Sequence, residues 1–368
     1  MDGTGKRARR HPPAEGTKGA AVAFGEEAAS DGRGSACDGP RVLVLGGAGF
    51  IGRHVVAALL ARGARPIVGS RQPRRRLARL PDAPGWCEAH IERLLAPEDW
   101  QPLLAGCDSV INCVGILRQR WGETYDRVHH RAPGALAAAC AARGLRLLHV
   151  SALGLGGPAR SRFLTSKRAG EDAVRAAGGD WHIVRPSLLD GDGGYGARWM
   201  RRVARWPVHP LPRGAIGRIA ALDVGDLGEA IARIALASPE DAVLATREHE
   251  LGGEHAGTLR EHLAALRAAG GHAPARVLRV PDVLVRITAH VCDLLHATPF
   301  SFGHWELLQR DNLPQPNALP GLLQHPPRPI GGRSLAAHAL PVAACPSDAG
   351  PATPPCRVST AAPAPASA

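Results

Sequence analysis

The sequence holds little of several residue types on which common kinds of site depend. Among 368 residues there are only two Tyr, five Phe and three Lys, so the positive charge comes almost entirely from 42 Arg. No run of 18 apolar residues occurs, and we therefore expect no membrane-spanning helix. The eight Cys form no C-x-x-C pair and lie near no set of His ligands. This pattern predicts free thiols in a reducing compartment, with neither a disulfide framework nor a metal site.

The formal net charge of +12 arises in the middle of the chain. Residues 1–40 hold six basic and six acidic residues, and residues 334–368 hold one of each. The basic cluster at residues 6–10 has no apolar stretch behind it, which speaks against a secretory signal. Arginine spread through helices is typical of a solvated surface, and no nucleic-acid-binding module is legible. We therefore expect a cytoplasmic protein that does not bind nucleic acid, with peripheral contact at the inner membrane left open.

Between two stretches that resemble disordered tails, residues 1–40 and 334–368, apolar runs alternate with helical patterns. The expected strands are 41–45, 65–70, 86–90, 109–114, 145–151 and 181–185. The expected helices are 50–63, 98–105, 126–143, 161–177, 223–237, 257–269 and 281–297. Such alternation predicts an α/β fold with a doubly wound, Rossmann-type parallel sheet. Residues 41–190 would form the dinucleotide-binding core, and residues 191–333 a smaller, mainly helical substrate region that completes the same fold.

The most informative stretch is a glycine-rich turn between the first expected strand and the first expected helix. The turn reads Gly46, Gly47, Ala48, Gly49, Phe50, Ile51, Gly52. A pyrophosphate binds against backbone N–H groups at a helix N-terminus, where the helix dipole favours negative charge. A Cβ in the turn would hold the phosphates away. The strand, turn and helix together predict a dinucleotide site.

The end of the second expected strand indicates which dinucleotide binds. An acid at this place pairs with the ribose 2′-hydroxyl of NAD, whereas an arginine accommodates the 2′-phosphate of NADP. Here Ser70 and Arg71 follow the strand, and no Asp or Glu stands beside them. We therefore expect NADP(H) in preference to NAD(H), although Arg71 is also explained as one more surface arginine in an arginine-rich chain.

With these residues the chain resembles the short-chain dehydrogenases/reductases over residues 41–330. It is similar to the atypical, epimerase/dehydratase-like group that includes the nucleotide-binding accessory subunit of respiratory complex I and its bacterial relatives. The resemblance rests on the glycine turn and on the segments Ile111–Leu117, His149–Gly154 and Arg185–Ser187. It implies that Asn112, Val114 and Gly115 line the cofactor cleft, and that Pro186 and Ser187 flank the nicotinamide.

The family's Tyr-x-x-x-Lys pair is incomplete in this chain. The matching stretch has Phe163 in the tyrosine position and Lys167 in the lysine position. By the resemblance, Lys167 binds the nicotinamide ribose, whereas Phe163 has no proton to exchange with a substrate. The helper hydroxyl is also reduced, because Ser151 is followed by Ala152. The family pattern is therefore complete for binding and incomplete for chemistry.

Another group has to supply the proton if the protein is an enzyme. Tyr195 lies in a glycine-rich stretch after the sixth expected strand, where ligands enter such folds. It is also explained as a loop aromatic, the interpretation that we favour. Tyr125, His129 and His130 lie at the start of a helix, and we expect both histidines on its solvent face.

Three functions stay open from the sequence. The first is an NADP(H)-dependent oxidoreductase with a displaced proton donor. The second is a cofactor-binding sensor or assembly factor without turnover, associated with respiratory-complex or membrane partners. The third is a membrane-peripheral protein that uses helix 281–297, although we expect the apolar stripe of that helix to be packed inside the fold. No motif in the sequence indicates the substrate or the oligomeric state.

Overall fold

A single seven-stranded parallel sheet organises the computed structural model, which describes residues 39–72, 85–157, 160–295 and 301–330. Its strands are β1 (Arg41–Leu45), β2 (Arg65–Ser70), β3 (Gly85–Glu88), β4 (Ser109–Asn112), β5 (Arg146–Val150), β6 (Trp181–Pro186) and β11 (Glu248–Leu251). They are ordered β11-β6-β5-β4-β1-β2-β3. The predicted doubly wound parallel sheet is confirmed.

The strand order reverses beside β1, and this reversal creates the crevice in which a ligand is bound in such folds. β1 pairs with β2 on one side, where Leu45 lies opposite Gly69, and with β4 on the other, where Leu45 lies opposite Asn112. From β2 the chain continues to β3 on one side of β1, and from β4 it continues to β5 on the other side. The carboxyl ends of these strands therefore open around residues 46–49.

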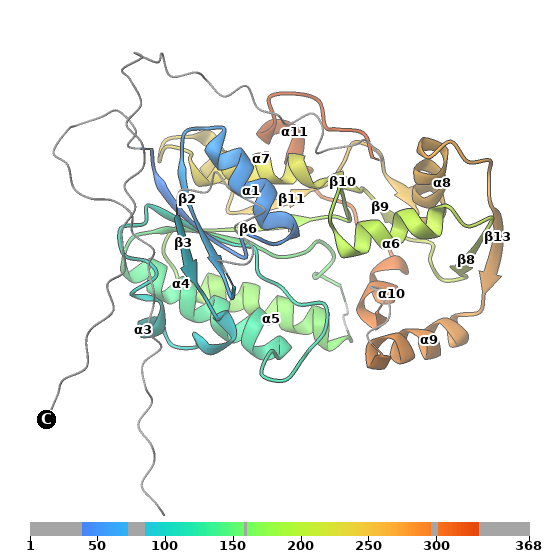
Figure 1. Ribbon diagram of the computed structural model, residues 1–368, viewed down its shortest axis with the longest axis horizontal. Helices are drawn as coiled ribbons and strands as arrows, with labels where there is room; N and C mark the ends of the chain where they lie inside the picture. The colour runs from blue at the N-terminus through green and yellow to red at the C-terminus, as the bar shows by residue number, and fades with distance from the viewer. Residues whose placement is uncertain (1–38, 73–84, 158–159, 296–300, 331–368) are drawn as a thin grey trace, which may run out of the picture.

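Helices cover both faces of the sheet because its central strands bury side chains on both sides. On one face lie α1 (Phe50–Leu60), α7 (Val224–Ala235) and α11 (Leu319–Leu322), and on the other lie α3 (Pro97–Trp100), α4 (Ala132–Ala142) and α5 (Arg162–Ala176) (Figure 1). Val42 and Val44 belong to the first core, whereas Leu43 and Leu45 belong to the second. The alternation of side chains along β1 thus builds two hydrophobic layers.

Side chains mark where the longer helices start. Asp223 accepts a hydrogen bond from Gly225 N at 2.7 Å before α7. Ser161 accepts one from Leu164 N at 3.4 Å before α5. Both are ordinary N-caps, which satisfy backbone donors that the first turn leaves without helical partners.

A smaller lobe lies at the carboxyl end of the sheet (Figure 1). Its helices are α6 (Tyr195–Ala204), α8 (Leu259–Ala269), α9 (Asp282–Leu295) and α10 (Phe302–Leu308). Its short strands form the pairs β8 (Val208–Pro212) with β13 (Arg276–Val280), and β9 (Arg218–Ile219) with β12 (Gly257–Thr258). The pair β7 (Leu189–Asp190) with β10 (Leu222–Asp223) joins the two parts. Short helical turns η1 (Ile91–Arg93) and η3 (Ala242–Ala245) complete the elements.

Two expected helices differ from the structure. The range 126–143 begins as a π-helical turn, η2 (Asp126–Arg131), before α4 continues it. The range 98–105 is helical only in α3, and turns follow it. The two predicted tails lie almost wholly outside the described residues. None of the helices in the described ranges combines the length and the apolar run that a bilayer crossing needs.

The expectation for helix 281–297 is wrong in one respect. Val283, Leu284, Ile287 and Val291 were expected inside the fold, but in α9 they are 66%, 53%, 56% and 47% exposed. The opposite face of α9 is the packed one, because Val285 and Ala289 are buried. The helix is apolar on both faces, and its hydrophobic pattern therefore could not indicate which face turns inward.

Candidate functional site

The glycine turn has the form that a diphosphate requires. Gly46 adopts φ +72°, and its N–H donates to Gly69 O at 2.8 Å. Gly49 N donates back to Gly46 O at 2.8 Å, which closes the turn at the start of α1. A Cβ at Gly52 would lie 2.2 Å from Gly46 O, so only glycine lets the helix approach the strand this closely. The first turn of α1 contains no acidic side chain that would repel a phosphate.

A cavity of about 900 Å³ runs from this turn along the carboxyl ends of the strands into the smaller lobe. Most of the residues predicted from the sequence line it. They are Gly46, Gly49, Phe50, Ile51, Ser70, Arg71, Val114, Gly115, Ser151, Phe163, Lys167, Pro186, Ser187 and Tyr195. The structure thus brings residues from seven separate segments to one continuous space.

Four predicted cofactor residues support the cavity without lining it. Asn112 is fully buried, and its Oδ1 accepts a hydrogen bond from Val114 N at 3.1 Å. Its Nδ2 lies 3.2 Å from His149 Nδ1. Asn112 was expected on the cleft wall, but it lies beneath the wall and fixes the loop that follows β4. Gly47, Ala48 and Gly52 form the back of the glycine turn.

Lys167 stands at the cavity beside the position of the missing tyrosine. It lies one turn after Phe163 on α5, and its Nζ is 5.8 Å from the Phe163 ring centroid. Nζ is also 3.8 Å from the position that a Cβ at Gly115 would take. The loss of water around the ammonium lowers the pKa of Lys167 to about 8, although Glu171 partly opposes this effect.

Glu171 is a site residue that the sequence did not reveal. It is 2% exposed, and Arg185 holds both of its carboxylate oxygens at 2.9 and 2.6 Å. Burial raises the pKa of Glu171, but the hydrogen bonds and charge of Arg185, together with the charge of Arg175, outweigh burial and keep that pKa below its ordinary value. Glu171 thus remains charged one turn beyond Lys167, where it favours the ammonium form. A single Glu within a helical stretch belongs to no motif, so the sequence could not indicate this role.

His129 was expected on a helix surface, but it is 3% exposed. The π-helical turn rotates it inward, where its Nε2 accepts a hydrogen bond from Ile116 N at 3.0 Å. Its Nδ1 then donates to Ser166 Oγ at 3.0 Å, and that hydroxyl donates to Phe163 O at 2.9 Å. Burial and the nearby Lys167 lower the pKa of His129 to about 2. His129 is therefore neutral, and it positions the cavity wall.

Tyr125 and His304 pack against Phe163, whereas Tyr195 lines the cavity elsewhere. Tyr125 donates its hydroxyl to Leu117 O at 2.8 Å and stacks on His129 at 5.4 Å between centroids. Tyr195 is the first residue of α6 and is 46% exposed at the cavity. His304, on α10, lies 5.9 Å from the Phe163 ring and lines the cavity. No motif indicates His304, because more than a hundred residues separate it from the family motifs.

The far end of the cleft is lined by three arginines and two glutamates, Glu92 and Glu123. A second cavity of about 550 Å³ adjoins the first at Arg71, and Arg93, Arg127 and His90 also line it. Arg71 forms an ion pair with Glu123, and its side chain remains 44% exposed. A cationic guanidinium is thus held where the adenosine end of a dinucleotide extends in this type of fold.

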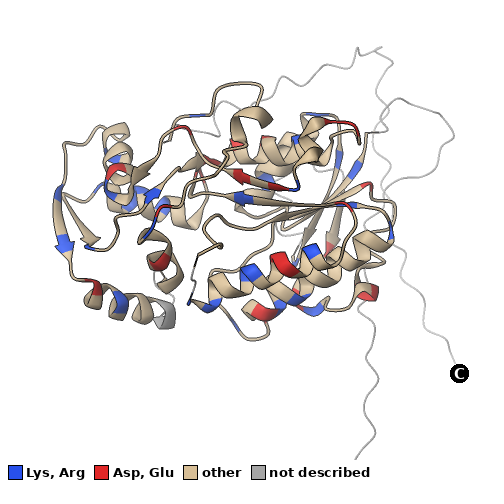
Figure 2. Ribbon diagram, turned by 180° about the vertical axis from the view of Figure 1, so that it is seen from behind, with Lys and Arg blue, Asp and Glu red and all other residues tan. Residues whose placement is uncertain are grey.

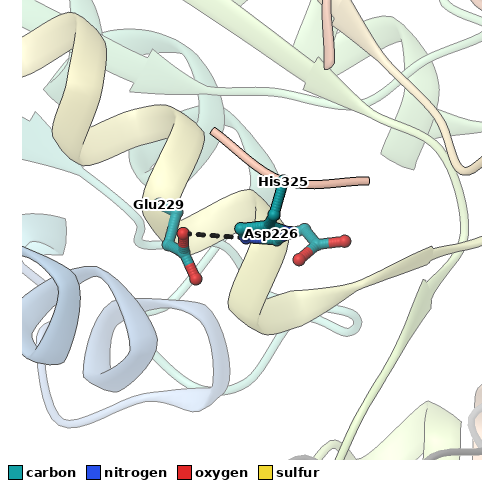
Figure 3. Close-up of side chains that lie close together, drawn as sticks. All are labelled: Asp226, Glu229 and His325. Carbon is teal, nitrogen blue, oxygen red and sulfur yellow. Dashed lines mark hydrogen bonds and ion pairs between the residues drawn. The ribbon is translucent and has the colours of Figure 1, made fainter. Parts of the chain in front are cut away.

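Asp226, Glu229 and His325 form a cluster away from the cleft (Figure 3). Their ligand atoms lie within 4.8 Å of one another, the spacing of a metal site. However, Arg328 forms ion pairs with both carboxylates, and His325 Nε2 lies 3.1 Å from Glu229. The guanidinium supplies the positive charge that the carboxylates need. The cluster therefore fastens residues 325–328 to α7.

Comparisons with known proteins agree with this geometry. The model of a family described as NAD(P)H-binding matches residues 46–221. The chain is 35% identical over 190 residues to a ceramide reductase of Caulobacter vibrioides, covering 50% of this chain and 57% of that protein. It is 27% identical over 236 residues to subunit 9 of the mitochondrial NADH dehydrogenase (ubiquinone) 1 alpha subcomplex of Arabidopsis thaliana, covering 62% and 57%. The chain thus matches little more than half the length of either relative.

Solved structures share the fold at low sequence identity. The UDP-glucuronic acid 4-epimerase of Bacillus cereus, in complex with UDP-glucuronic acid and NAD, superposes with a TM-score of 0.55 at 16% identity, covering 78% of this chain and 94% of that one. The Bordetella bronchiseptica enzyme WbmG in complex with NAD gives 0.52 at 18% identity, covering 68% and 83%. The match of residues 46–221 to the NAD(P)H-binding family model agrees with the glycine turn, and the chain shares its Rossmann-type fold with a UDP-glucuronic acid 4-epimerase solved in complex with NAD.

Proposed function

We propose that the protein is an NADP(H)-dependent reductase of a carbonyl group carried by a lipid with long apolar chains, and that Lys167 supplies the proton. The observation that carries the proposal is a lysine of lowered pKa on the wall of an apolar cavity that is continuous with the glycine turn. The match to the NAD(P)H-binding family model supports a nicotinamide cofactor. The lipid is suggested by the cavity and by the similarity to a ceramide reductase.

The residues of the cleft fit a nicotinamide dinucleotide. The turn at Gly46 and Gly49 would hold the diphosphate, and Ser70 with Arg71 would hold the adenosine ribose and its 2′-phosphate. Pro186 and Ser187 would flank the nicotinamide. When bound there, a reduced nicotinamide would supply the hydride that reduces a carbonyl carbon.

Lys167 completes the reduction at the other atom of the carbonyl group. As the carbon gains a hydride, the oxygen gains negative charge and needs a proton to become a hydroxyl. An ammonium with a pKa of about 8 is protonated at neutral pH and releases its proton more readily than an ordinary lysine. Glu171 keeps the ammonium charged until the transfer, and Phe163 excludes water beside it. Lysine thereby takes the role that tyrosine has in the family.

The wall of the cavity beyond Lys167 supports an apolar substrate. From α6, α8 and α9 it presents mainly aliphatic and aromatic side chains, namely Trp199, Met200, Val203, Leu259, Leu263 and Val285. A sugar nucleotide would leave its hydroxyl groups without partners against such side chains. A hydrocarbon chain gains about 0.8 kcal/mol for each methylene that it buries there.

The experiment follows NADPH oxidation with ketones that share one head group and differ in chain length. We expect kcat/KM to rise by roughly fourfold per methylene until the cavity is filled. Arg71→Ala should weaken NADPH binding by about tenfold and leave NADH binding unchanged, because only NADPH carries the 2′-phosphate. Arg143→Ala, at an exposed arginine remote from the cleft, is the control. Turnover that is independent of chain length would refute a lipid substrate, and equal loss of both cofactors would refute the preference for NADPH.

A second function is favoured by one specific observation. The usual proton-donating tyrosine is Phe163, and the second hydroxyl of the serine pair is Ala152, beside an intact glycine turn. A protein that binds the dinucleotide without turnover, as a sensor or an assembly factor, would have this combination. The similarity to a subunit of a respiratory NADH dehydrogenase supports this alternative. This alternative would be favoured if the purified protein bound NADPH tightly but did not oxidise it in the presence of any lipid ketone tested.

A further inference from the structure

Helix α9 separates the cavity from solvent, and it is apolar on both sides. Val285 and Cys292 face the cavity. Val283, Leu284 and Ile287 lie on the other side and are all more than half exposed. A helix that is hydrophobic all round is ordinarily buried in a core or in a membrane, but α9 lies at the edge of the molecule (Figure 1).

The exposed side chains of α9 continue onto the preceding strand, β13. Leu278 is 58% exposed there, between the exposed arginines Arg276 and Arg279. Arg286 is exposed on α9 itself. Basic positions thus occur along both β13 and α9, and acidic positions also occur on α9 (Figure 2). We call this surface the β13–α9 face, defined by Arg276, Leu278, Arg279, Val283, Leu284, Arg286, Ile287 and Val291.

α9 carries two acidic residues, Asp282 and Asp293. Asp282 Oδ1 accepts a hydrogen bond from Gly214 N at 2.8 Å. The β13–α9 face thus combines large exposed hydrophobic side chains with three arginines, which outnumber the acidic residues of α9 by one. This combination is typical of helices that lie in the interface of anionic membranes.

We propose that the β13–α9 face docks on a lipid bilayer that contains anionic headgroups. The hydrophobic side chains would enter the boundary between headgroups and acyl chains, while the arginines pair with lipid phosphates. A second copy of the chain fits this face less well. A twofold contact would place Arg276, Arg279 and Arg286 against the same residues of the partner, and like charges across an interface oppose association.

The position of α9 would allow a docked protein to take up a lipid directly from the membrane. This step rests on the proposed function. One side of the helix would face the bilayer, and its other side lines the cavity that we assign to a lipid chain. A lipid substrate would then pass around one helix from the membrane to Lys167 without crossing water. Exposure of a long hydrocarbon chain to water is the main barrier to moving a lipid between a membrane and a soluble site.

The experiment measures co-sedimentation of the full chain with vesicles, in the absence of cofactor and substrate. Vesicles of phosphatidylcholine are compared with vesicles that also hold phosphatidylglycerol. We expect binding to the anionic vesicles only, and a loss of more than tenfold for Ile287→Glu. Trp121→Glu is the matched control, because it places the same charge at a fully exposed hydrophobic residue elsewhere. Leu278→Glu tests the same face from β13 if Ile287→Glu does not fold.

A second pair of variants tests the charges. Arg286→Glu should weaken binding by about fivefold or more, whereas Arg131→Glu, an exposed arginine beside α4, should not. The proposal would be overturned if the wild-type protein did not bind anionic vesicles. It would also be overturned if Ile287→Glu and Trp121→Glu bound them equally well. A change from dimer to monomer in Ile287→Glu, seen by sedimentation velocity, would also overturn it in favour of a contact between copies. Because no turnover is measured, docking and reduction can fail independently.

Discussion

At the scale of single residues, the contrast between Phe163 and Lys167 determines what this protein can do. Both line the cavity from the same face of α5, but only Lys167 carries a proton. Lysine is rare in the chain, and this one has a lowered pKa at the junction of cofactor cleft and apolar cavity. Perturbed pKa values of this kind cluster at functional sites.

The first prediction concerns the pH dependence of turnover. Lys167 must be protonated to donate, so the single-turnover rate of NADPH oxidation should be constant below pH 8. It should fall about tenfold per unit as the pH rises through about 8. Lys167→Arg should be slow and should lack this fall, because arginine stays protonated throughout. A wild-type rate that remains flat to pH 10 would show that another group is the donor.

The second prediction restores the missing phenol. In Phe163→Tyr, the hydroxyl would enter the cavity one turn before Lys167, where the ammonium lowers the phenol pKa. If wild type is a slow reductase, we expect kcat to rise by at least tenfold at unchanged KM for NADPH. If the wild-type protein binds NADPH without oxidising it, and Phe163→Tyr oxidises NADPH, then the natural protein is a cofactor-binding sensor. Phe302→Tyr, which adds a phenol on the neighbouring helix α10 and outside the Tyr-x-x-x-Lys spacing, serves as the control.

At the scale of elements, the packing of α1 against β1 depends on Gly52. Its missing Cβ leaves room for Gly46 O at 2.2 Å and for Gly47 Cα at 2.6 Å from the position that it would take. Gly52→Ala should therefore push the helix away from the turn. We expect destabilisation of about 1–3 kcal/mol and more than tenfold weaker dinucleotide binding.

Urea unfolding and cofactor titration check this prediction against Gly321→Ala. Gly321 lies in helix α11, and a Cβ there meets nothing within 4 Å. Alanine in a helix is favoured over glycine, so this control should be neutral or more stable by up to about 1 kcal/mol. Equal effects in both variants would contradict the role that we give to the turn.

The strands and the turn could be predicted from the sequence because their signals are local. A short apolar run followed by glycines at fixed spacing is visible in a single stretch. The inward position of His129 depends on a π-helical turn within what reads as one helix. Glu171 and His304 belong to the site only because β6 and α10 meet α5 in the fold. The prediction that the apolar stripe of α9 is buried was wrong because the helix is apolar on two sides, and its pattern does not indicate which side packs inward.

At the scale of the whole molecule, buried histidines make stability depend on pH. Burial lowers the pKa of His149 and of His249 to about 4, and that of His129 to about 2. In the unfolded chain these groups titrate near 6.5. Between pH 6.5 and 4 the unfolded state therefore binds more protons than the folded state. Stability is complete above 6.5 and is lost as the pH falls towards 4.

Urea unfolding at pH 7, 6 and 5 measures this loss. Three protons taken up on unfolding correspond to a slope of up to about 4 kcal/mol per pH unit. His249→Gln should reduce the slope by roughly a third, whereas His130→Gln, at a partly exposed side chain, should leave it unchanged. A free energy of unfolding that does not change down to pH 5 would contradict the assignment of these histidines as neutral and buried.

The path of the chain after the smaller lobe has a practical consequence. The residues that match the family model end at 221, yet β11 and α7 lie beyond that point and cover β6 and α1. Arg328 then ties a still later segment to α7. An excised nucleotide-binding half would expose an unpaired strand edge and a bare hydrophobic layer, and we expect it to aggregate when expressed alone. Attempts to dissect this protein should therefore remove α8 to α10 as an internal excision and retain everything on either side.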